Sequence, residues 1–159
     1  MRLDPKHKIS RKGLTVWRLY GIFEMLGILA VACVVSYLTI RNDWPQWIHA
    51  IGITLTLLSL IFSVIIFPKV RWERWRYEVR EQEIEVKHGL FIVKRTIIPM
   101  VRVQHVDTTQ GPILKKYDLS NIYISTAATI HTIPALAMNE ADELRARISD
   151  LARVAEEDV

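Results

Sequence analysis

Histidine is the first residue type in this chain whose chemistry and spacing call for attention. The five histidines are His7, His49, His88, His105 and His131. No two of them have the three- or four-residue spacing that places metal ligands on one face of a helix. His105 and Asp107 lie two positions apart in a predicted strand, so their side chains share a face and could form a metal-binding or acid–base pair. Because no third ligand is evident, we interpret this pair as a structural hydrogen bond.

Motifs for nucleophilic catalysis and for phosphate binding are weak as well. Ser125 lacks the flanking glycines of a nucleophile elbow. The segment 111–116, Gly-Pro-Ile-Leu-Lys-Lys, has one glycine and no hydroxyl residue after its lysines, unlike a phosphate-binding loop. The sequence therefore predicts no enzyme, no catalytic or metal-binding residues and no cofactor.

Glu24 is the one acidic residue within an otherwise apolar run, 19–40. An acid inside a membrane segment is a candidate for a proton path. Glu24 lies about one turn inside the predicted cytoplasmic end of the run, however, where it can reach the interface or pair with Arg18. We favour this structural interpretation and keep the proton path as the alternative.

Two long apolar runs dominate the first half of the chain, at 19–40 and 47–67. At about 1.5 Å of helix rise per residue, each reaches roughly 30 Å, the thickness of a bilayer's hydrocarbon core. We predict a hairpin of two transmembrane helices over 19–67, joined by the polar turn 41–45. A cleaved signal peptide, or a lipoprotein signal ending at Cys33, fits less well, because the apolar run continues for seven residues beyond Cys33.

Basic residues flank the predicted hairpin on both sides and indicate its orientation. Those before the first span are Arg2, Lys6, Lys8, Arg11, Lys12 and Arg18, and those after the second are Lys69, Arg71, Arg74 and Arg76. The turn between the spans contains one base, Arg41, beside Asp43. Because positive charge near the ends of spans stays in the cytoplasm, we predict a multi-pass cell-membrane protein with two spans and both termini cytoplasmic.

The composition fits a membrane protein with a polar second half. The 159 residues are 50% hydrophobic and carry a net charge of +4, with a pI of about 9.3. The basic excess is concentrated at the predicted cytoplasmic flanks, where it complements anionic headgroups. Membrane lipids are therefore the expected partners, and nucleic acid is not. The single cysteine, Cys33, excludes an intrachain disulfide.

Short segments border the predicted hairpin. Residues 1–18 form a cytoplasmic basic arm, flexible over 1–16, and Pro68 is expected to end the second helix because proline has no amide donor. The segment 68–76 is a collar of basic and aromatic residues that anchors the span at the interface, with a specific anionic-lipid site as the alternative. The candidate lipid-facing bases are Lys69, Arg71, Arg74, Arg76, Lys94 and Arg95.

From Trp75 onward the period of the apolar residues changes to two, which predicts strands. We expect strands at 75–80, 83–88, 90–98, 101–105, 119–126 and 129–133, with Pro99 and Pro134 ending the third and the last, and a helical turn at 113–117. A helix capped by Asn139 follows and continues to about residue 155. The predicted fold class is an α+β membrane protein, with a small antiparallel β-barrel or sandwich and a C-terminal capping helix over 75–155.

This order of elements resembles the bacterial pleckstrin-homology-like (PH-like) domain, which often follows a pair of membrane spans. The segments that carry the resemblance are 98–106, 110–114, 122–127 and 133–136, with the helix that opens at 140–142. They are mostly strand and turn residues, so they indicate fold more than function. The resemblance implies a partner, a larger membrane protein with several copies of the same domain, and PH-like folds in general bind lipid headgroups or proteins. It transfers no phosphoinositide-binding residue to this chain.

Small and polar residues form a stripe along the second predicted span: His49, Gly52, Thr56, Ser59 and Ser63. Their spacing of three and four places them on one face of the helix. Lipid provides no hydrophobic drive for helix association, so close packing of small residues must supply it. The stripe packs within the hairpin, with Gly27 or the Ala32 and Ser36 pair as counterparts, or it also contacts a helix of a larger partner.

Together these features predict a non-enzymatic integral membrane protein whose cytoplasmic PH-like domain is an interaction module in a membrane complex. Two alternatives stay open. One is an accessory subunit of a membrane transport or export system, in which Glu24 matters, and the other is an anionic-lipid-binding module. Recovery of a membrane partner in mild detergent would favour the first prediction.

Overall fold

The computed structural model describes residues 4–157 of the chain. By its internal contacts the chain divides into two compact units. The first, Thr15–Val70, is named here the hairpin unit. The second combines the N-terminal segment up to Leu14 with the chain from Arg71 onward, and is named the strand-rich unit.

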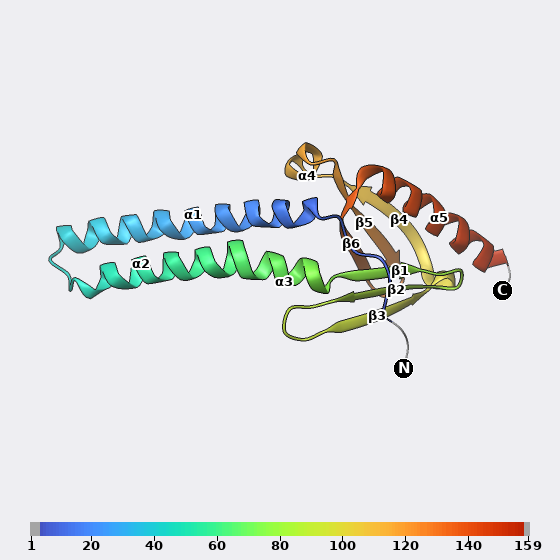
Figure 1. The fold of residues 1–159 in the computed structure, drawn as a ribbon, viewed down its shortest axis with the longest axis horizontal. Helices are drawn as coiled ribbons and strands as arrows, with labels where there is room; N and C mark the ends of the chain where they lie inside the picture. Colours follow the sequence, from blue (N-terminus) through green and yellow to red (C-terminus); the bar gives the residue numbers. More distant parts are fainter. Residues whose placement is uncertain (1–3, 158–159) are drawn as a thin grey trace. The chain divides into compact units, whose positions relative to one another are not determined.

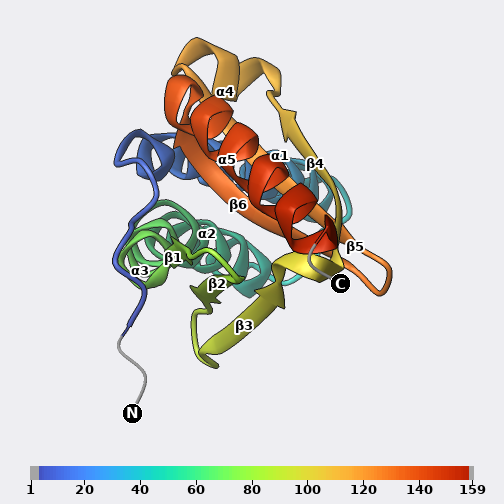
Figure 2. The same ribbon diagram turned by 90° about the vertical axis from the view of Figure 1, so that its right-hand side faces the viewer.

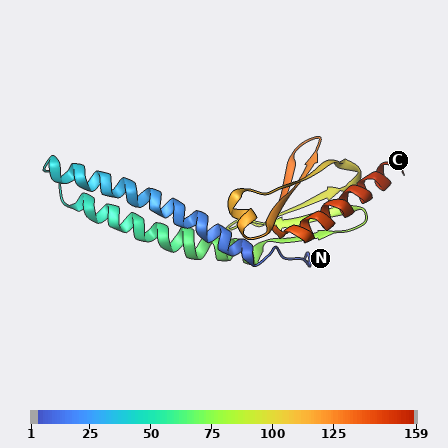
Figure 3. The same ribbon diagram turned by 90° about the horizontal axis from the view of Figure 1, so that it is seen from above.

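Two long antiparallel helices lie side by side in the hairpin unit (Figure 3). The first is α1 (Lys12–Arg41), and the second is built from α2 (Trp47–Ser59), the π-helical segment η1 (Leu60–Ile66) and α3 (Phe67–Arg74). Both are long and apolar enough to cross a bilayer. Leu, Ile, Val and Phe side chains are exposed along both helices, as expected of surfaces that face lipid. The predicted membrane localisation with two apolar helices is thereby supported.

Both helices extend beyond the predicted spans. α1 begins at Lys12 rather than at residue 19, and the second helix continues past Pro68 to Arg74, so the expected helix end at Pro68 is wrong. A proline inside a helix lacks the amide donor, and its ring clashes with the carbonyl four residues back. Here the preceding turns are π-helical, and the Phe67 amide donates to the Phe62 carbonyl, five residues back. The wider turn interrupts the regular ladder just before the proline, so the helix continues through it.

The strand-rich unit contains two antiparallel sheets (Figure 1). The strands are β1 (Arg76–Val79), β2 (Glu83–His88), β3 (Lys94–Pro99), β4 (Val103–Thr109), β5 (Leu119–Thr126) and β6 (Ile130–Ala137). One sheet has the order β1-β2-β3 and the other the order β4-β5-β6. The helices are η2 (Met100–Arg102), a 3₁₀ turn before β4, α4 (Pro112–Lys116) after β4, and α5 (Met138–Glu157).

Helix α5 lies across the second sheet and contacts its three strands (Figure 2). The core comes from apolar strand residues: Ile84, Ile98, Leu119, Ile122, Ile124, Ile133 and Leu136 are at most 2% exposed. From α5, Ala141 and Ile148 are fully buried. The predicted fold class, an α+β membrane protein with a PH-like antiparallel domain and a C-terminal helix, is confirmed. The described strands do not close into a barrel.

Four predicted strands have different ends, and β1 (Arg76–Val79) and β4 (Val103–Thr109) replace the expected 75–80 and 101–105. β3 begins at Lys94 rather than at residue 90, because Lys94 pairs with His88 and residues 89–93 form the connecting loop. β6 continues through Pro134, although this proline was expected to end it. The register shifts opposite Asn121, whose Oδ1 accepts the Ala135 amide at 2.9 Å. This bulge accommodates a residue that has no amide to donate.

The N-terminal segment packs on the strand-rich unit. His7 and Tyr77 exchange two backbone hydrogen bonds, of 3.1 and 3.0 Å, along the free edge of β1. The Ser10 amide donates to the Ala135 carbonyl at 3.1 Å, and Ile9 is 2% exposed. The expected flexible arm is therefore wrong for the described part of this segment, because the open edge of a sheet offers it backbone partners. Residues 1–3 of the predicted arm lie outside the described residues.

Candidate membrane-facing site

The collar, residues 68–76, connects the second long helix to β1. Three of its predicted lipid-facing bases, Lys69, Arg71 and Arg74, are exposed. The fourth, Arg76, is half-buried, and its Nη1 donates to two carbonyls of the collar at 2.9 and 3.1 Å. The four bases of the collar are thus not equally exposed to solvent, and Arg76 forms hydrogen bonds with the backbone of the collar itself.

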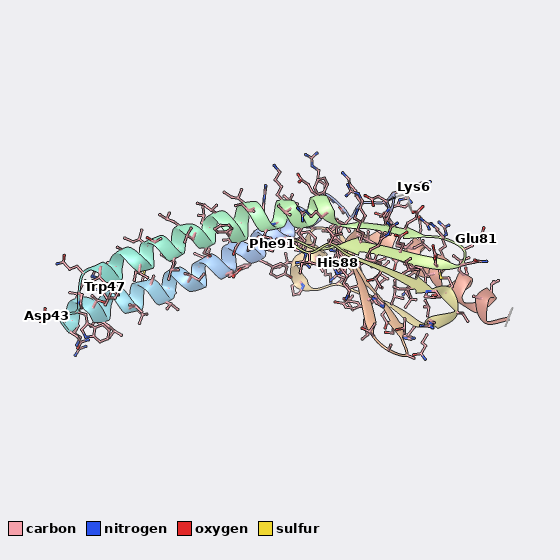
Figure 4. The ribbon with its side chains drawn as sticks, turned by 90° about the horizontal axis from the view of Figure 1, so that it is seen from below. Lys6, Asp43, Trp47, Glu81, His88 and Phe91 are labelled. Atoms are coloured by element: carbon pink, nitrogen blue, oxygen red, sulfur yellow. The ribbon has the colours of Figure 1, made fainter. Side chains whose placement is uncertain are left out.

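The loop between β2 and β3, residues 89–93, exposes three consecutive apolar side chains. Phe91 is 87% exposed, Ile92 84% and Val93 51%. Gly89 has a φ of +134°, and a Cβ at this position would lie 2.0 Å from the Ile92 carbonyl oxygen. The close turn therefore requires glycine. Residues 89–93 are named the apolar loop, and Figure 4 shows its Phe91 and the β1–β2 turn residue Glu81 at opposite ends of the first sheet.

The apolar loop is held against the collar. Arg74 Nη1 donates a hydrogen bond to the Leu90 carbonyl oxygen. The Trp75 indole stacks on the His88 imidazole just before the loop, with ring centroids 5.2 Å apart and planes inclined by 14°. One arginine and one aromatic pair therefore fix the base of the loop beside the last turn of α3.

An open cavity of about 420 Å³ lies next to the apolar loop and the collar. Its polar lining residues come from the collar, β2, β3 and the start of β6: Arg71, His88, Lys94, Thr96, Thr129, His131 and Thr132. None of the described lining residues is acidic. We name this space the cationic cavity, since it brings together two permanently charged bases and two imidazoles.

The electrostatics of the cationic cavity disfavour further positive charge. Burial lowers the pKa of His88, and the nearby charges of Lys94 and Arg71 lower it further, followed by His131. Burial also lowers the pKa of His131, with Lys94 as the second cause. Both imidazoles are therefore held toward the neutral form, in which one ring nitrogen donates and the other accepts.

Lys94 and Arg95 point to opposite faces of β3. Lys94 lies opposite His88 in the sheet register and lines the cationic cavity. The Arg95 Nε donates to Glu85, a fully buried carboxylate whose second oxygen lies 3.3 Å from Arg80 Nη2. Of these two predicted lipid-facing bases, Lys94 faces a cavity and Arg95 neutralises a buried acid.

The predicted stripe on the second span lies at the inner side of the hairpin unit. His49, Gly52, Thr56, Ser59 and Ser63 are all half-buried, whereas the neighbouring Ile51, Leu55, Leu58 and Phe62 are exposed. A Cβ on Gly52 would lie 3.3 Å from the Ala32 Cβ. The structure thus brings Gly52 and Ala32 together, while a Cβ on Gly27 would meet nothing within 4 Å.

A second close approach in the hairpin unit was missed by sequence reasoning. A Cβ on Gly21 would lie 2.2 Å from the Ser63 carbonyl oxygen, so the two backbones touch there. A single glycine in an apolar run does not indicate which backbone approaches it. The stripe residue Ser63 was the available signal, because it lies on the same face as Gly52.

Glu24 lines an open, mostly apolar groove of about 450 Å³ between α1 and α2. The groove also includes Gly27 and Gly52. Among the described residues, no ion pair joins Glu24 to Arg18, which was one of the two structural interpretations; the other, that Glu24 reaches the interface, stays a prediction. The Glu24 side chain is exposed in the isolated chain, at the wall of the groove.

His105 and Asp107 form the contact expected from their spacing. Nε2 of His105 lies 3.2 Å from Oδ1 of Asp107, and the two side chains are 70% and 55% exposed. Within residues 4–157, no group of three or more histidine, cysteine, aspartate or glutamate side chains could hold a metal ion. An exposed pair on a strand surface offers neither a closed site nor a cavity for a substrate.

Comparison with known proteins agrees with this architecture. The profile of the family described as Bacterial PH domain matches residues 21–152. The chain belongs to this family. It is 54% identical over 159 residues to UPF0699 transmembrane protein YdbS of Bacillus subtilis (strain 168), with the whole of both chains covered. The predicted resemblance to the bacterial PH-like family is thus confirmed.

A second relative is larger. Over 113 residues the chain is 24% identical to UPF0699 transmembrane protein YdbT of Bacillus subtilis (strain 168). This match covers 69% of this chain and 22% of YdbT. No solved structure matches the chain. The profile match includes most of the hairpin unit and most of the strand-rich unit after Arg71, and the name bacterial PH domain is used below for the strand-rich unit.

Proposed function

We propose that this chain is a non-enzymatic membrane-anchored module whose bacterial PH domain docks on the cytoplasmic surface of the bilayer that anchors it. The observation that carries the proposal is the apolar loop: Phe91 and Ile92 are more than four-fifths exposed in a loop held by the end of a membrane helix. Exposed apolar side chains in adjacent positions mark an interaction surface. A lipid surface is the occupant that the position of the loop favours.

Distances along the chain support a position of the loop near the headgroups. Arg74 follows Phe67, the last residue of the apolar run, by seven residues, which is about 10 Å of helix. The polar region on each side of the hydrocarbon core is roughly 5 to 8 Å deep. Arg74 therefore lies near the outer limit of the headgroups, and it holds Leu90. Arg71, one turn closer to the span along the chain, lines the same cavity as Leu90, which supports a position of the loop near the bilayer surface.

The energetics favour insertion of the loop tip. Moving a Phe, Ile or Val side chain fully out of water contributes roughly 1.5 to 3 kcal/mol each. A base beside an anionic leaflet adds about 1 kcal/mol. The domain is already tethered by the hairpin, so docking does not require the entropy of bringing two molecules together. These terms together are sufficient to hold a small domain against the surface.

The N-terminal segment supports one part of the topology. His7 pairs with β1, which supports an N-terminus and a bacterial PH domain on the same side of the membrane. The bases that flank both spans favour the cytoplasm for that side. We therefore propose that both termini are cytoplasmic and that the turn near Asn42 is external.

Site-directed spin labelling of the full chain in bilayer nanodiscs tests the docking. In a Cys33→Ala background, a nitroxide on Ile92→Cys should collide mainly with dissolved oxygen, and one on Glu81→Cys mainly with a water-soluble nickel chelate. Glu81 is the matched control, because it is an exposed residue in the turn at the other end of β2. Equal accessibility of the two labels to the nickel chelate would refute docking of the loop.

The same cysteine variants test the topology. In intact cells, a membrane-impermeant maleimide should label Asn42→Cys and leave Glu81→Cys unmodified. Labelling of Glu81→Cys without disruption of the membrane would place the bacterial PH domain outside and contradict the proposal.

A second candidate function is that of a subunit in a complex with a larger membrane protein related to this chain. The observation that favours it is the similarity to YdbT, of which the matched region is 22%. The resemblance to the bacterial PH-like family implies such a partner, and YdbT is a transmembrane protein longer than this chain. Docking on lipid and assembly with such a partner are compatible, because they use the loop and the hairpin respectively.

A further inference from the structure

We infer that residues 4–10 form a strap that closes the strand-rich unit by joining its two sheets, and that this strap opens while both sheets stay folded. The segment is named here the N-terminal strap. It lies before the region matched by the family profile, which begins at residue 21. The strap is separate from the apolar loop, so its test does not depend on docking of that loop on lipid.

Backbone hydrogen bonds attach the N-terminal strap to one edge of each sheet. In the sheet orders, β1 and β6 are edge strands. His7 and Tyr77 of β1 exchange two backbone hydrogen bonds, of 3.1 and 3.0 Å. The Ser10 amide donates to the Ala135 carbonyl of β6 at 3.1 Å. In Figure 1 this segment, dark blue before α1, runs past both strands. Because an edge strand has unpaired backbone groups, one extended segment supplies partners to both sheets.

The side chains of the N-terminal strap include two buried anchors with exposed residues between them. Pro5 and Ile9 are buried, and Ile9 is only 2% exposed. Lys6 and Lys8, which lie between the two anchors, are exposed. Burial of Ile9 removes apolar surface from water and therefore favours the closed position of the strap. Ile9 directly precedes Ser10, so this anchor lies next to the hydrogen bond that reaches the second sheet.

The two residues that receive the strap are held by other elements. The Tyr77 hydroxyl donates to Glu140 of α5 at 2.7 Å. The Ala135 amide donates to Asn121 Oδ1 of β5 at 2.9 Å, and Ala135 has a φ of +53° in the bulge of β6. A left-handed φ is uncommon for alanine and persists only where the surrounding structure holds the residue. Because α5 and β5 hold Tyr77 and Ala135, we expect both positions to keep their structure when the strap is open.

The strap is attached more weakly than a strand inside a sheet. Among the described residues, His7 and Tyr77 form an isolated bridge rather than a ladder. The strap also forms an ion pair, Asp4 with Lys87 at 2.7 Å, but 65% of the Asp4 side chain is exposed, and exposed ion pairs contribute little to stability. Segments with few buried contacts open locally, before the core of the fold does. The open strap would leave the backbone edge at Tyr77 and the Ala135 carbonyl free to pair with another strand.

Hydrogen exchange of tyrosine amides tests the strap, measured by NMR on the full chain with isotope-labelled tyrosine in bilayer nanodiscs. The Tyr77 amide donates to His7 and reports on the strap. The Tyr123 amide lies in β5, the central strand of the second sheet, and reports on the folded unit. In Ile9→Asp, exchange at Tyr77 should become about tenfold faster or more, while exchange at Tyr123 stays as in wild type. Lys6→Gln is the matched control, because Lys6 is exposed in the same segment, and it should follow wild type at both amides.

Ile9→Ala is a milder second variant, for the case that the buried charge of Ile9→Asp prevents folding. Its exchange at Tyr77 should lie between that of wild type and that of an open strap, again with Tyr123 unchanged. Equal exchange at Tyr77 in wild type and in both variants would show that the strap does not cover the edge of β1 and would overturn the inference. Acceleration at Tyr77 and Tyr123 by the same factor in Ile9→Ala would also overturn it, because the segment would then open only when the whole unit unfolds.

Discussion

At the scale of single residues, His88 and His131 occupy positions that disfavour their protonated forms. Burial is the largest cause for both, and Lys94 is the second. A histidine whose pKa in the folded chain lies below its ordinary value of 6.5 binds a proton more readily when the chain unfolds. Its contribution to stability is therefore complete above pH 6.5 and is lost as the pH falls through the lower, folded-state pKa.

This linkage predicts an acid-sensitive fold. Between about pH 7.5 and about pH 5.5, we expect the Tm of the full chain in detergent to fall by roughly a few degrees. The fall should be smaller in His88→Gln, which has no imidazole to protonate. His105→Gln, on the exposed face of β4, is the control and should follow wild type. Identical dependence of Tm on pH in wild type and His88→Gln would show that His88 is not the group responsible.

The partners of single residues were not all predictable from the sequence. Lys94 and Arg95 are adjacent bases at the start of one strand, and strand geometry alone predicts that they face opposite sides. The sequence does not indicate which side contains Glu85, because Glu85 lies on the neighbouring strand and register decides its position. His88 was predicted only as a strand residue. The cavity that it lines also includes His131, which is distant in the sequence, so the sequence alone does not indicate that the two lie together.

At the scale of elements, the two membrane helices approach most closely at glycines. A Cβ on Gly21 would lie 2.2 Å from a backbone oxygen of Ser63, which cannot move aside without separating the helices. Gly27 occupies the same helix, and a Cβ there would meet nothing within 4 Å. In a membrane, close packing of small residues replaces the hydrophobic drive, so these two positions should differ sharply.

We expect Gly21→Ala to destabilise the full chain by about 1 to 3 kcal/mol, the usual range for overpacking. Gly27→Ala should be neutral or stabilise it by up to about 1 kcal/mol, because alanine favours helix more than glycine does. Thermal unfolding of both variants in the same detergent measures the difference. Equal stability of the two variants would mean that the helices do not touch at Gly21.

The ends of helices and strands were predictable where the local pattern of residues determines them. They were less predictable where partners distant in the sequence determine them. The alternation of apolar residues gave β2 and β5 with their correct ends, 83–88 and 119–126. Pro68 and Pro134 were expected to end their elements, because a π-helical turn and a bulge opposite Asn121 are not visible in the local sequence. The pairing of His7 with Tyr77 joins segments 70 residues apart, so the N-terminal segment resembled a free arm in the sequence.

At the scale of the whole molecule, one chain combines a membrane hairpin with a strand-rich unit that exposes an apolar loop, and it is similar to two transmembrane proteins of one organism. We propose that the apolar loop contacts lipid, and the cationic cavity lies next to it. The groove of about 450 Å³ on the hairpin unit, with Gly27 at its wall, is separate from both. A helix of a larger relative is the partner we propose for that groove, since lipid-exposed small residues allow close approach.

Co-purification tests this assembly in the organism that makes the chain. In mild detergent, the tagged full chain should be recovered with a larger membrane protein that contains copies of the same domain. Gly27→Leu should reduce that recovery severalfold, because a leucine side chain would occupy part of the groove, and a Cβ at residue 27 has open space. Leu29→Ala is a control on the same helix that leaves the groove lining unchanged. Recovery of wild type as a monomer without any companion would count against the assembly, and full recovery with folded Gly27→Leu would move the contact away from the groove.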